Sequence, residues 1–349
     1  MAKSADSSKR RVLSIALAVV GLATFLAIAR FILGADLGRV VEVLKNIAVL
    51  PFAIAILVRL STPLLHVMGM YFATLCIGRA LRFRDMFVGI TAALAMEYVA
   101  PVGGVTEVYK VFYLTRRGLT LNEASLSVFL HRVALSLSIA TVFGIACIVS
   151  YVPSYVATIL WIAIAALAFG NVVGLTFFCY RKTSSFVSRI ASWIVAKMKI
   201  EAVLNPMNLS RFEKPRFRSK YLLLLAASTL LERFTVAFSG YMLARSLGIS
   251  IDILEAVVLF DAINTVVWLL PAMTPGFVGM LETVQSIAFT AYGIEPSLAT
   301  SLAILNRIAI LVAVVPQLLP FLAKDVREVL EAISRERSVL LEGSETVNR

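Results

Sequence analysis

The chain has 349 residues, and its composition is too apolar for a soluble protein of that length. Hydrophobic residues make up 60% of the sequence and charged residues 15%, and the mean hydropathy is +0.89. Soluble domains contain roughly 45–50% apolar and about 25% charged residues. The net charge of +12 is concentrated between apolar runs, which is typical of membrane orientation rather than of nucleic-acid binding. These features exclude a soluble enzyme, a nucleic-acid-binding domain and a secreted disulfide scaffold.

The N-terminal region is predicted to contain one membrane span. Residues 1–11 are polar and basic, and residues 12–33 form an apolar stretch of about 22 residues. The apolar core of a signal peptide has only about 7–15 residues, so we expect an uncleaved span here. With the outer connection that follows, this unit covers residues 12–46.

The next part of the chain, residues 47–180, combines full spans with one broken pair of helices. Three segments are long enough to cross a membrane: residues 47–77, 121–150 and 154–180. The segment 85–117 is instead interrupted by a Pro/Gly break, at Pro101, Gly103 and Gly104. The eleven residues after this break extend roughly 16 Å as a helix, about half of a hydrocarbon core 30 Å thick. We therefore expect a re-entrant hairpin over 85–117.

A basic segment, residues 181–220, follows this first half. It carries ten Lys and Arg residues against two acidic residues. Apolar residues at helical spacing between positions 186 and 198 predict an amphipathic helix in the headgroup plane. A solvated linker with a short surface helix is an equal alternative.

The second half, residues 221–323, repeats the pattern of the first. Full spans are expected over residues 221–247 and 297–323. A second hairpin is expected over 252–292, with Pro275, Gly276 and Gly279 in its break. The tail, residues 324–349, has mixed charge. The predicted fold is thus an all-α polytopic membrane protein with about six full transmembrane helices and two re-entrant hairpins.

An internal repeat relates the two halves. When the sequence is aligned with itself, Gly104–Arg132 matches Gly279–Arg307 without a gap, and seven of the 29 positions are identical. The matches include a glycine, a glutamate and an arginine, which an apolar composition does not supply. When the Lys and Arg clusters are placed in the cytosol, both termini and the basic segment lie on the cytosolic side of a multi-pass protein of the cell membrane. Three spans then separate the starts of the halves, and this odd number predicts an inverted repeat, as in many transporters.

Charged residues within the repeat form the predicted binding site. Glu107 and Glu282 begin the second arm of each hairpin, where free helix N–H groups favour a phosphate. Arg132 and Arg307 lie roughly 15 Å into their spans, near the middle of the membrane, where a charge needs a partner. The four side chains are expected to hold an anionic headgroup. The alternative is that they only pair with one another and fix the fold.

Other ionisable residues in the apolar segments, among them Arg59, Glu97 and Asp261, predict no catalytic, metal or cofactor site. A proton relay through one of the carboxylates stays open, and nothing in the sequence selects the residue. Glu232 and Arg233 are adjacent and should face different sides of a helix, which argues against a mutual pair. His66 is expected to be an interhelical hydrogen-bond donor. Because His66 and His131 have no ligand spacing and the three cysteines form no CxxC motif, the sequence predicts neither a metal nor a cofactor.

The two broken segments resemble the flippase-like, or lysylphosphatidylglycerol synthase, transmembrane region, which is the membrane domain of multiple-peptide-resistance factors. The family motif Pro-Gly-x-x-Gly-Glu followed by Arg corresponds here to Pro101-Val-Gly-Gly-Val-Thr-Glu107 with Lys110. The motif Pro-x-x-Pro-Gly-Gly-x-Gly-x-x-Glu corresponds to Pro271-Ala-Met-Thr-Pro275-Gly276-Phe-Val-Gly279-Met-Leu-Glu282, with Arg307 following. Lys110 stands in place of the usual Arg, and His131 in place of the usual Glu. The resemblance covers nearly all of residues 12–323.

The resemblance implies a protein that moves an anionic phospholipid or a lipid-linked molecule between leaflets. The implied substrate-binding residues are Glu107, Lys110, Arg132, Glu282 and Arg307. Glu282→Gln or Arg307→Ala is expected to abolish transfer and leave membrane insertion intact. Only the short tail follows the last span, so we expect neither the aminoacyl-transfer domain of full-length resistance factors nor enzyme activity.

Two other functions remain open. The protein could be a membrane subunit that docks a separate glycosyl- or aminoacyl-transferase through the basic segment. It could also be an intramembrane transferase with Glu107 or Glu282 as general base.

Overall fold

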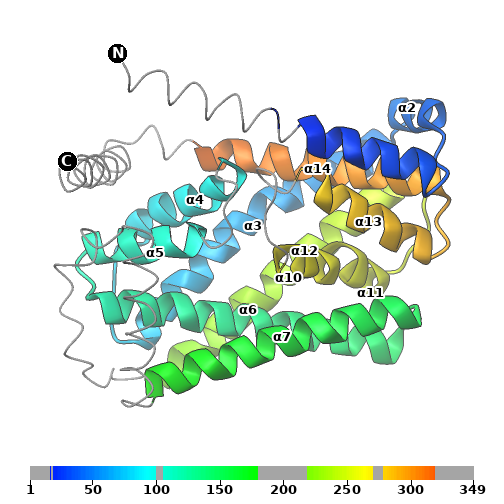
Figure 1. Cartoon of the computed structure of the whole chain (residues 1–349). Helices are drawn as coiled ribbons and strands as arrows, with labels where there is room; N and C mark the ends of the chain where they lie inside the picture. Colours follow the sequence, from blue (N-terminus) through cyan, green and yellow to red (C-terminus); the bar gives the residue numbers. More distant parts are fainter. Residues whose placement is uncertain (1–15, 17–18, 100–104, 180–217, 270–277, 319–349) are drawn as a thin grey trace, which may run out of the picture.

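The computed structural model describes residue 16 and residues 19–99, 105–179, 218–269 and 278–318. Within these ranges the secondary structure is entirely helical (Figure 1). Five helices of the described part are long and apolar enough to cross a membrane, and Val19–Phe31 is a shorter apolar helix that falls within the first expected span. The prediction of an all-α polytopic membrane protein is therefore confirmed.

The helices of the first half agree with the expected segments to within a few residues. They are α3 (Val49–Cys76), α4 (Phe83–Val99), α5 (Val105–Arg116), α6 (Leu121–Val149) and α7 (Ser154–Cys179), and the short α2 (Leu37–Lys45) precedes them. The start of α6 follows directly from its sequence, which is a Thr-x-x-Glu capping box. Glu123 N–H donates to Thr120 Oγ1, and Thr120 N–H donates to Glu123 Oε2 at 2.8 Å.

The second half begins with a short 3₁₀ turn, η1 (Ser219–Tyr221), and α10 (Leu222–Ser246). The next helical run is α11 (Ile253–Ala256), the π-helical turn η2 (Val257–Ala262) and α12 (Ile263–Leu269), and it is followed by α13 (Met280–Ala291) and α14 (Pro296–Leu318). Asp252 caps this run, because its Oδ1 accepts from the N–H groups of Leu254 and Glu255. π-Helical turns are rare and occur frequently at functional sites, and η2 contains Asp261.

The two halves match element by element. In chain order α4 corresponds to the run from α11 to α12 (residues 253–269), and α5 corresponds to α13. The turns match as well, because Gly78 and Gly248 end α3 and α10 with φ of +82° and +73°. Positive φ favours glycine, which has no Cβ to clash there. The halves therefore share one order of elements, and their inversion across a membrane stays a prediction.

The equivalent helices α3 and α10 pack against each other along much of their length at the centre of the molecule (Figure 1). Their backbones approach closely enough for the Ser239 hydroxyl to donate to the carbonyl of Ala55 at 3.0 Å. In Figure 1, α7 lies on one side of this pair, and α14 with the N-terminal helix lies on the other. Residues of both halves are thus brought together between α3 and α10.

The N-terminal helix packs against the start of α13 at a glycine. Gly279 precedes α13 with φ of +84°, and a Cβ built on it would lie 2.0 Å from the carbonyl oxygen of Gly21. Gly279 has a ψ of −39°, outside the left-handed helical region, so we expect Gly279→Ala to destabilise the protein by more than the roughly 1–2 kcal/mol of a residue in that region. The methyl group also pushes the N-terminal helix away. Thermal unfolding of the detergent-purified protein measures this loss.

Gly293→Ala is the matched control for this substitution. Gly293 has φ of +81°, but a Cβ there would meet no atom within 4 Å, so only the conformational cost applies. Equal losses in the two variants would contradict the close packing of the N-terminal helix on Gly279.

Several predicted features lie outside the described residues. They are residues 1–11, the break residues Pro101, Gly103, Gly104, Pro275 and Gly276, the segment 181–217, and the tail 324–349. The re-entrant path of both hairpins and the interfacial helix therefore stay predictions.

Candidate functional site

A cavity of about 200 Å³ lies between helices of both halves. Its charged lining consists of Arg59, Glu107, Lys110, Arg132, Glu232, Arg233, Asp261 and Arg307. Much of the remaining wall is aliphatic, and includes Leu135, Ile139 and Ile310. The lining of the cavity therefore combines charged and aliphatic side chains. Four of the five predicted binding residues line it, and Glu282 does not.

The predicted Glu–Arg pair of the first half is open and loosely held. Glu107 Oε1 lies 3.6 Å from Arg132 Nη1 and 3.3 Å from Lys110 Nζ. Glu107 Oε2 is buried and has no hydrogen-bond partner among the described residues. The Arg132 side chain is 46% exposed, more than that of any other charged residue around the cavity. Arg132 can therefore take up a second partner without first leaving a buried position.

The equivalent pair of the second half is closed. Arg307 makes a bidentate contact with Glu282, from Nε to Oε1 and from Nη2 to Oε2, the latter at 3.0 Å. Both side chains are less than a tenth exposed. The predicted free N–H group at this helix start is also occupied, because Gly279 N–H donates to Glu282 Oε2 at 2.8 Å. In both halves the glutamate pairs with the arginine of the next long helix, as the fold-stabilising alternative requires.

A chain of polar contacts among residues that line the cavity joins the two halves. Lys110 Nζ of α5 donates to His66 Nε2 of α3 at 3.0 Å, and His66 Nδ1 donates to Glu232 Oε1 of α10 at 3.0 Å. Arg233 then lies between two carboxylates, with 2.6 Å to Glu232 and 2.9 Å to Asp261 of η2. A hydrogen-bonded network of charges in a low-dielectric interior is strongly coupled, so a change at one end affects the other.

This chain corrects one expectation from the sequence and agrees with another. Glu232 and Arg233 do form a mutual pair, because the long arginine side chain reaches back to its neighbour while it also binds Asp261. His66 is an interhelical donor, as expected. Glu232, Arg233 and Asp261 were not predicted as site residues. The available signal was their charge within apolar segments, which does not identify their partners.

The second half has an uncharged counterpart to part of this network. Gln285 and Asn306 occupy the positions that correspond to Lys110 and His131 in the repeat. Gln285 Nε2 donates to Asn264 Oδ1 at 3.0 Å, and Asn306 Nδ2 donates to Gln285 Oε1 at 3.1 Å. The repeat therefore places ionisable groups at these two positions in the first half and amides in the second.

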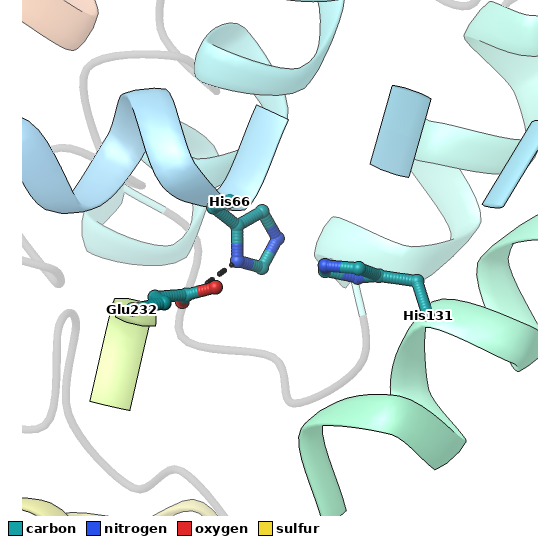
Figure 2. Close-up of side chains that lie close together, drawn as sticks. All are labelled: His66, His131 and Glu232. Carbon is teal, nitrogen blue, oxygen red and sulfur yellow. Dashed lines mark hydrogen bonds and ion pairs between the residues drawn. The ribbon is translucent and has the colours of Figure 1, made fainter. Parts of the chain in front are cut away.

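His66 and His131 meet although the sequence gives them no ligand spacing. Their ring centroids are 4.5 Å apart and the rings are nearly perpendicular, at 83°. Figure 2 shows the imidazole of His131 extending from α6 toward that of His66, which is hydrogen-bonded to Glu232. The prediction that no metal site exists considered only distances along the sequence, and it missed that helix packing brings these side chains together.

A comparison with protein families finds a model that matches this chain. No curated protein matches the sequence. A family model described as the lysylphosphatidylglycerol synthase TM region matches residues 12–316, which include α2 to α13 and most of α14. This match covers most of the chain and all the charged residues of the cavity. The chain therefore belongs to the family of lysylphosphatidylglycerol synthase transmembrane regions.

Proposed function

We propose that this membrane protein moves an anionic phospholipid or lipid-linked molecule between leaflets, and that the cavity binds its phosphate-bearing headgroup. The observation that carries the proposal is the charge of the cavity. Five Lys and Arg side chains line it, against three carboxylates. Glu282 pairs with Arg307 from outside the lining, so one positive charge remains in excess. An excess of positive charge in a low-dielectric interior is costly unless an anion joins it.

The shape and chemistry of the cavity support a lipid rather than a free anion. Aliphatic residues of α6, α7 and α14 line it beside the charged groups, for example Leu135, Leu167 and Ile310. An amphipathic ligand would place its headgroup against Arg132 and its acyl chains along these residues. Lys110, Glu107 and Arg307 then orient the headgroup, and Glu282 holds Arg307 in place.

We further propose that the matched halves form an inverted repeat whose broken hairpins enter the bilayer from opposite faces, with both termini in the cytosol. The distribution of Lys and Arg supports this orientation. Such repeats place substrate sites near the middle of the membrane. Arg132 is eleven residues after the start of α6 and Arg307 eleven after the start of α14, so both lie about 16 Å along their helices. The protein would act as a transporter without changing the lipid covalently.

The proposal is tested with purified protein in vesicles that contain a trace of fluorescent lipid. Dithionite, which bleaches only the outer leaflet, reports the rate of transfer. We expect labelled phosphatidylglycerol to be transferred at least about tenfold faster than zwitterionic phosphatidylcholine, corresponding to about 1.4 kcal/mol of preference for the anion.

Vesicles without protein and vesicles with heat-denatured protein give the background rate. Equal rates for both lipids would contradict an anion-selective cavity. Absence of transfer above background would contradict a translocase that works without a partner, and would favour a subunit that serves a separate transferase.

A further inference from the structure

Three buried side chains from three different helices converge beside the cavity: His66 of α3, His131 of α6 and Glu232 of α10 (Figure 2). One ligand atom from each residue lies within 4.8 Å of the other two. Two imidazoles and one carboxylate are a donor set that suits Zn²⁺ and related divalent transition metals. We propose that these three residues bind a divalent metal ion of the zinc class.

Two of the three candidate ligands carry polar atoms that lack a partner. His131 Nε2 and Glu232 Oε2 are buried and make no hydrogen bond to any described residue. The residues themselves are only 1% and 3% exposed. Buried polar atoms in native proteins nearly always have a partner. Because a ligand atom of each residue lies within 4.8 Å of the other, one bound ligand can be reached by both residues.

The local packing leaves room for His131 to reach this place. Gly69 follows His66 by one helical turn on α3, and a Cβ on Gly69 would lie 2.7 Å from His131 Nε2. A side chain at this position would therefore block the imidazole. Around a tetrahedral zinc ion, ligand atoms are roughly 3.3 Å apart. Side-chain rotations that move the ligand atoms by about 1–2 Å would therefore complete the site.

The ion would keep one coordination position for a ligand from the cavity. Three protein ligands with an open fourth position are the pattern of catalytic rather than structural zinc sites. His66 and Glu232 both line the cavity, so a water molecule or an anionic oxygen can reach that fourth position. The metal would thus place a positive centre at the wall of the same cavity.

Nearby cations determine how tightly the ion binds. Lys110 Nζ lies 3.0 Å from His66 Nε2, and both nitrogens of His66 are engaged in hydrogen bonds, one of which the metal must displace. Lys110 has an alternative partner in Glu107, at 3.3 Å. Because an ammonium group opposes a dication at this distance, removing the charge of Lys110 should strengthen metal binding.

The test is a metal titration of the full-length protein, purified in detergent without a histidine tag and stripped with EDTA. The chain contains two histidines, and both belong to the proposed site. We expect one Zn²⁺ per chain by calorimetry, and Co²⁺ should give the visible absorption of a tetrahedral site. His131→Asn and Glu232→Gln should weaken binding by at least about 100-fold, whereas Lys110→Met should strengthen it about tenfold.

Two features of the design separate ligand loss from misfolding. Asn306 occupies the position equivalent to His131 in the second half, so an amide is an appropriate replacement. Lys110→Met is expected to gain affinity, which a misfolded protein would not do. Glu42→Gln, on the exposed α2, is the control that should leave binding unchanged.

The proposal is overturned if the wild-type protein shows no saturable binding of Zn²⁺ or Co²⁺. It is equally overturned if binding persists in His131→Asn and Glu232→Gln, or if Lys110→Met does not tighten it. The titration involves no lipid and no transfer, so its outcome is independent of the proposed transport function.

Discussion

Arg132→Ala is expected to slow the transfer of an anionic lipid by about 10- to 100-fold, the loss of one charge-assisted hydrogen bond. The guanidinium group of Arg132 is the most exposed cation of the cavity, and its ion pair with Glu107 is a loose one, at 3.6 Å. Glu107 keeps Lys110 as a neighbour when Arg132 is removed. The unfolding temperature should therefore fall by no more than a few degrees, because half-exposed ion pairs contribute little.

Two further variants show whether the transfer of the anionic lipid depends on the guanidinium group at position 132 or only on positive charge. Arg132→Lys keeps the charge but loses bidentate contact with a phosphate, and should transfer at an intermediate rate. Arg39→Ala removes a similarly exposed cation that does not line the cavity and whose ion pair with Glu295 is also loose, at 3.9 Å. It should transfer at the wild-type rate. Wild-type transfer by Arg132→Ala would show that this guanidinium does not hold the headgroup.

Arg307→Ala is expected to act mainly on the fold, at a cost of about 3–5 kcal/mol in the free energy of unfolding. Arg307 and Glu282 form a buried bidentate pair, so removing the arginine leaves a carboxylate inside the protein that still accepts from Gly279 N–H. The fall in unfolding temperature should be on the order of 10 °C. From the sequence alone, Arg307→Ala is expected to abolish lipid transfer and leave membrane insertion intact. The buried pair with Glu282 leads us to expect a loss of stability as well.

The double variant Glu282→Gln with Arg307→Met separates the uncompensated charge from the loss of contacts. It removes both charges together, and replacing both members of a buried pair is often neutral or stabilising. The glutamine can still accept from Gly279 N–H. We expect its thermal unfolding in detergent to lie close to that of the wild type. Unchanged unfolding of Arg307→Ala itself would refute the buried pair.

The Glu107–Arg132 pair is loose and the Glu282–Arg307 pair is closed because the neighbouring residues differ between the two halves. The positions occupied by Lys110 and His131 in the first half carry Gln285 and Asn306 in the second. These amides bond to each other and to Asn264, so they do not compete with Arg307 for the carboxylate of Glu282. In the first half Lys110 competes for Glu107, so Arg132 stays loosely held.

Much of this architecture could be predicted from the order of residues. Long apolar runs and Pro/Gly breaks predict the membrane helices because hydrocarbon tolerates only backbone whose hydrogen bonds are satisfied. The repeat also predicted that Glu107 and Glu282 lie near arginines, but not whether the pairs form within or between the halves. The structure places each pair within its own half. Both predictions are consequences of local periodicity and of internal similarity.

The central network could not be predicted in this way. His66 and Glu232 are far apart in the sequence, and they meet only because α3 packs against α10. His131 reaches the same place through the close approach that Gly69 permits. The helices, the repeat and the presence of charged residues in apolar segments follow from the order of residues, because they depend only on composition and spacing. Which charged side chains pair, which stay loosely held and that both histidines face Glu232 are known only from the folded structure, because helix packing and not distance along the chain determines those contacts.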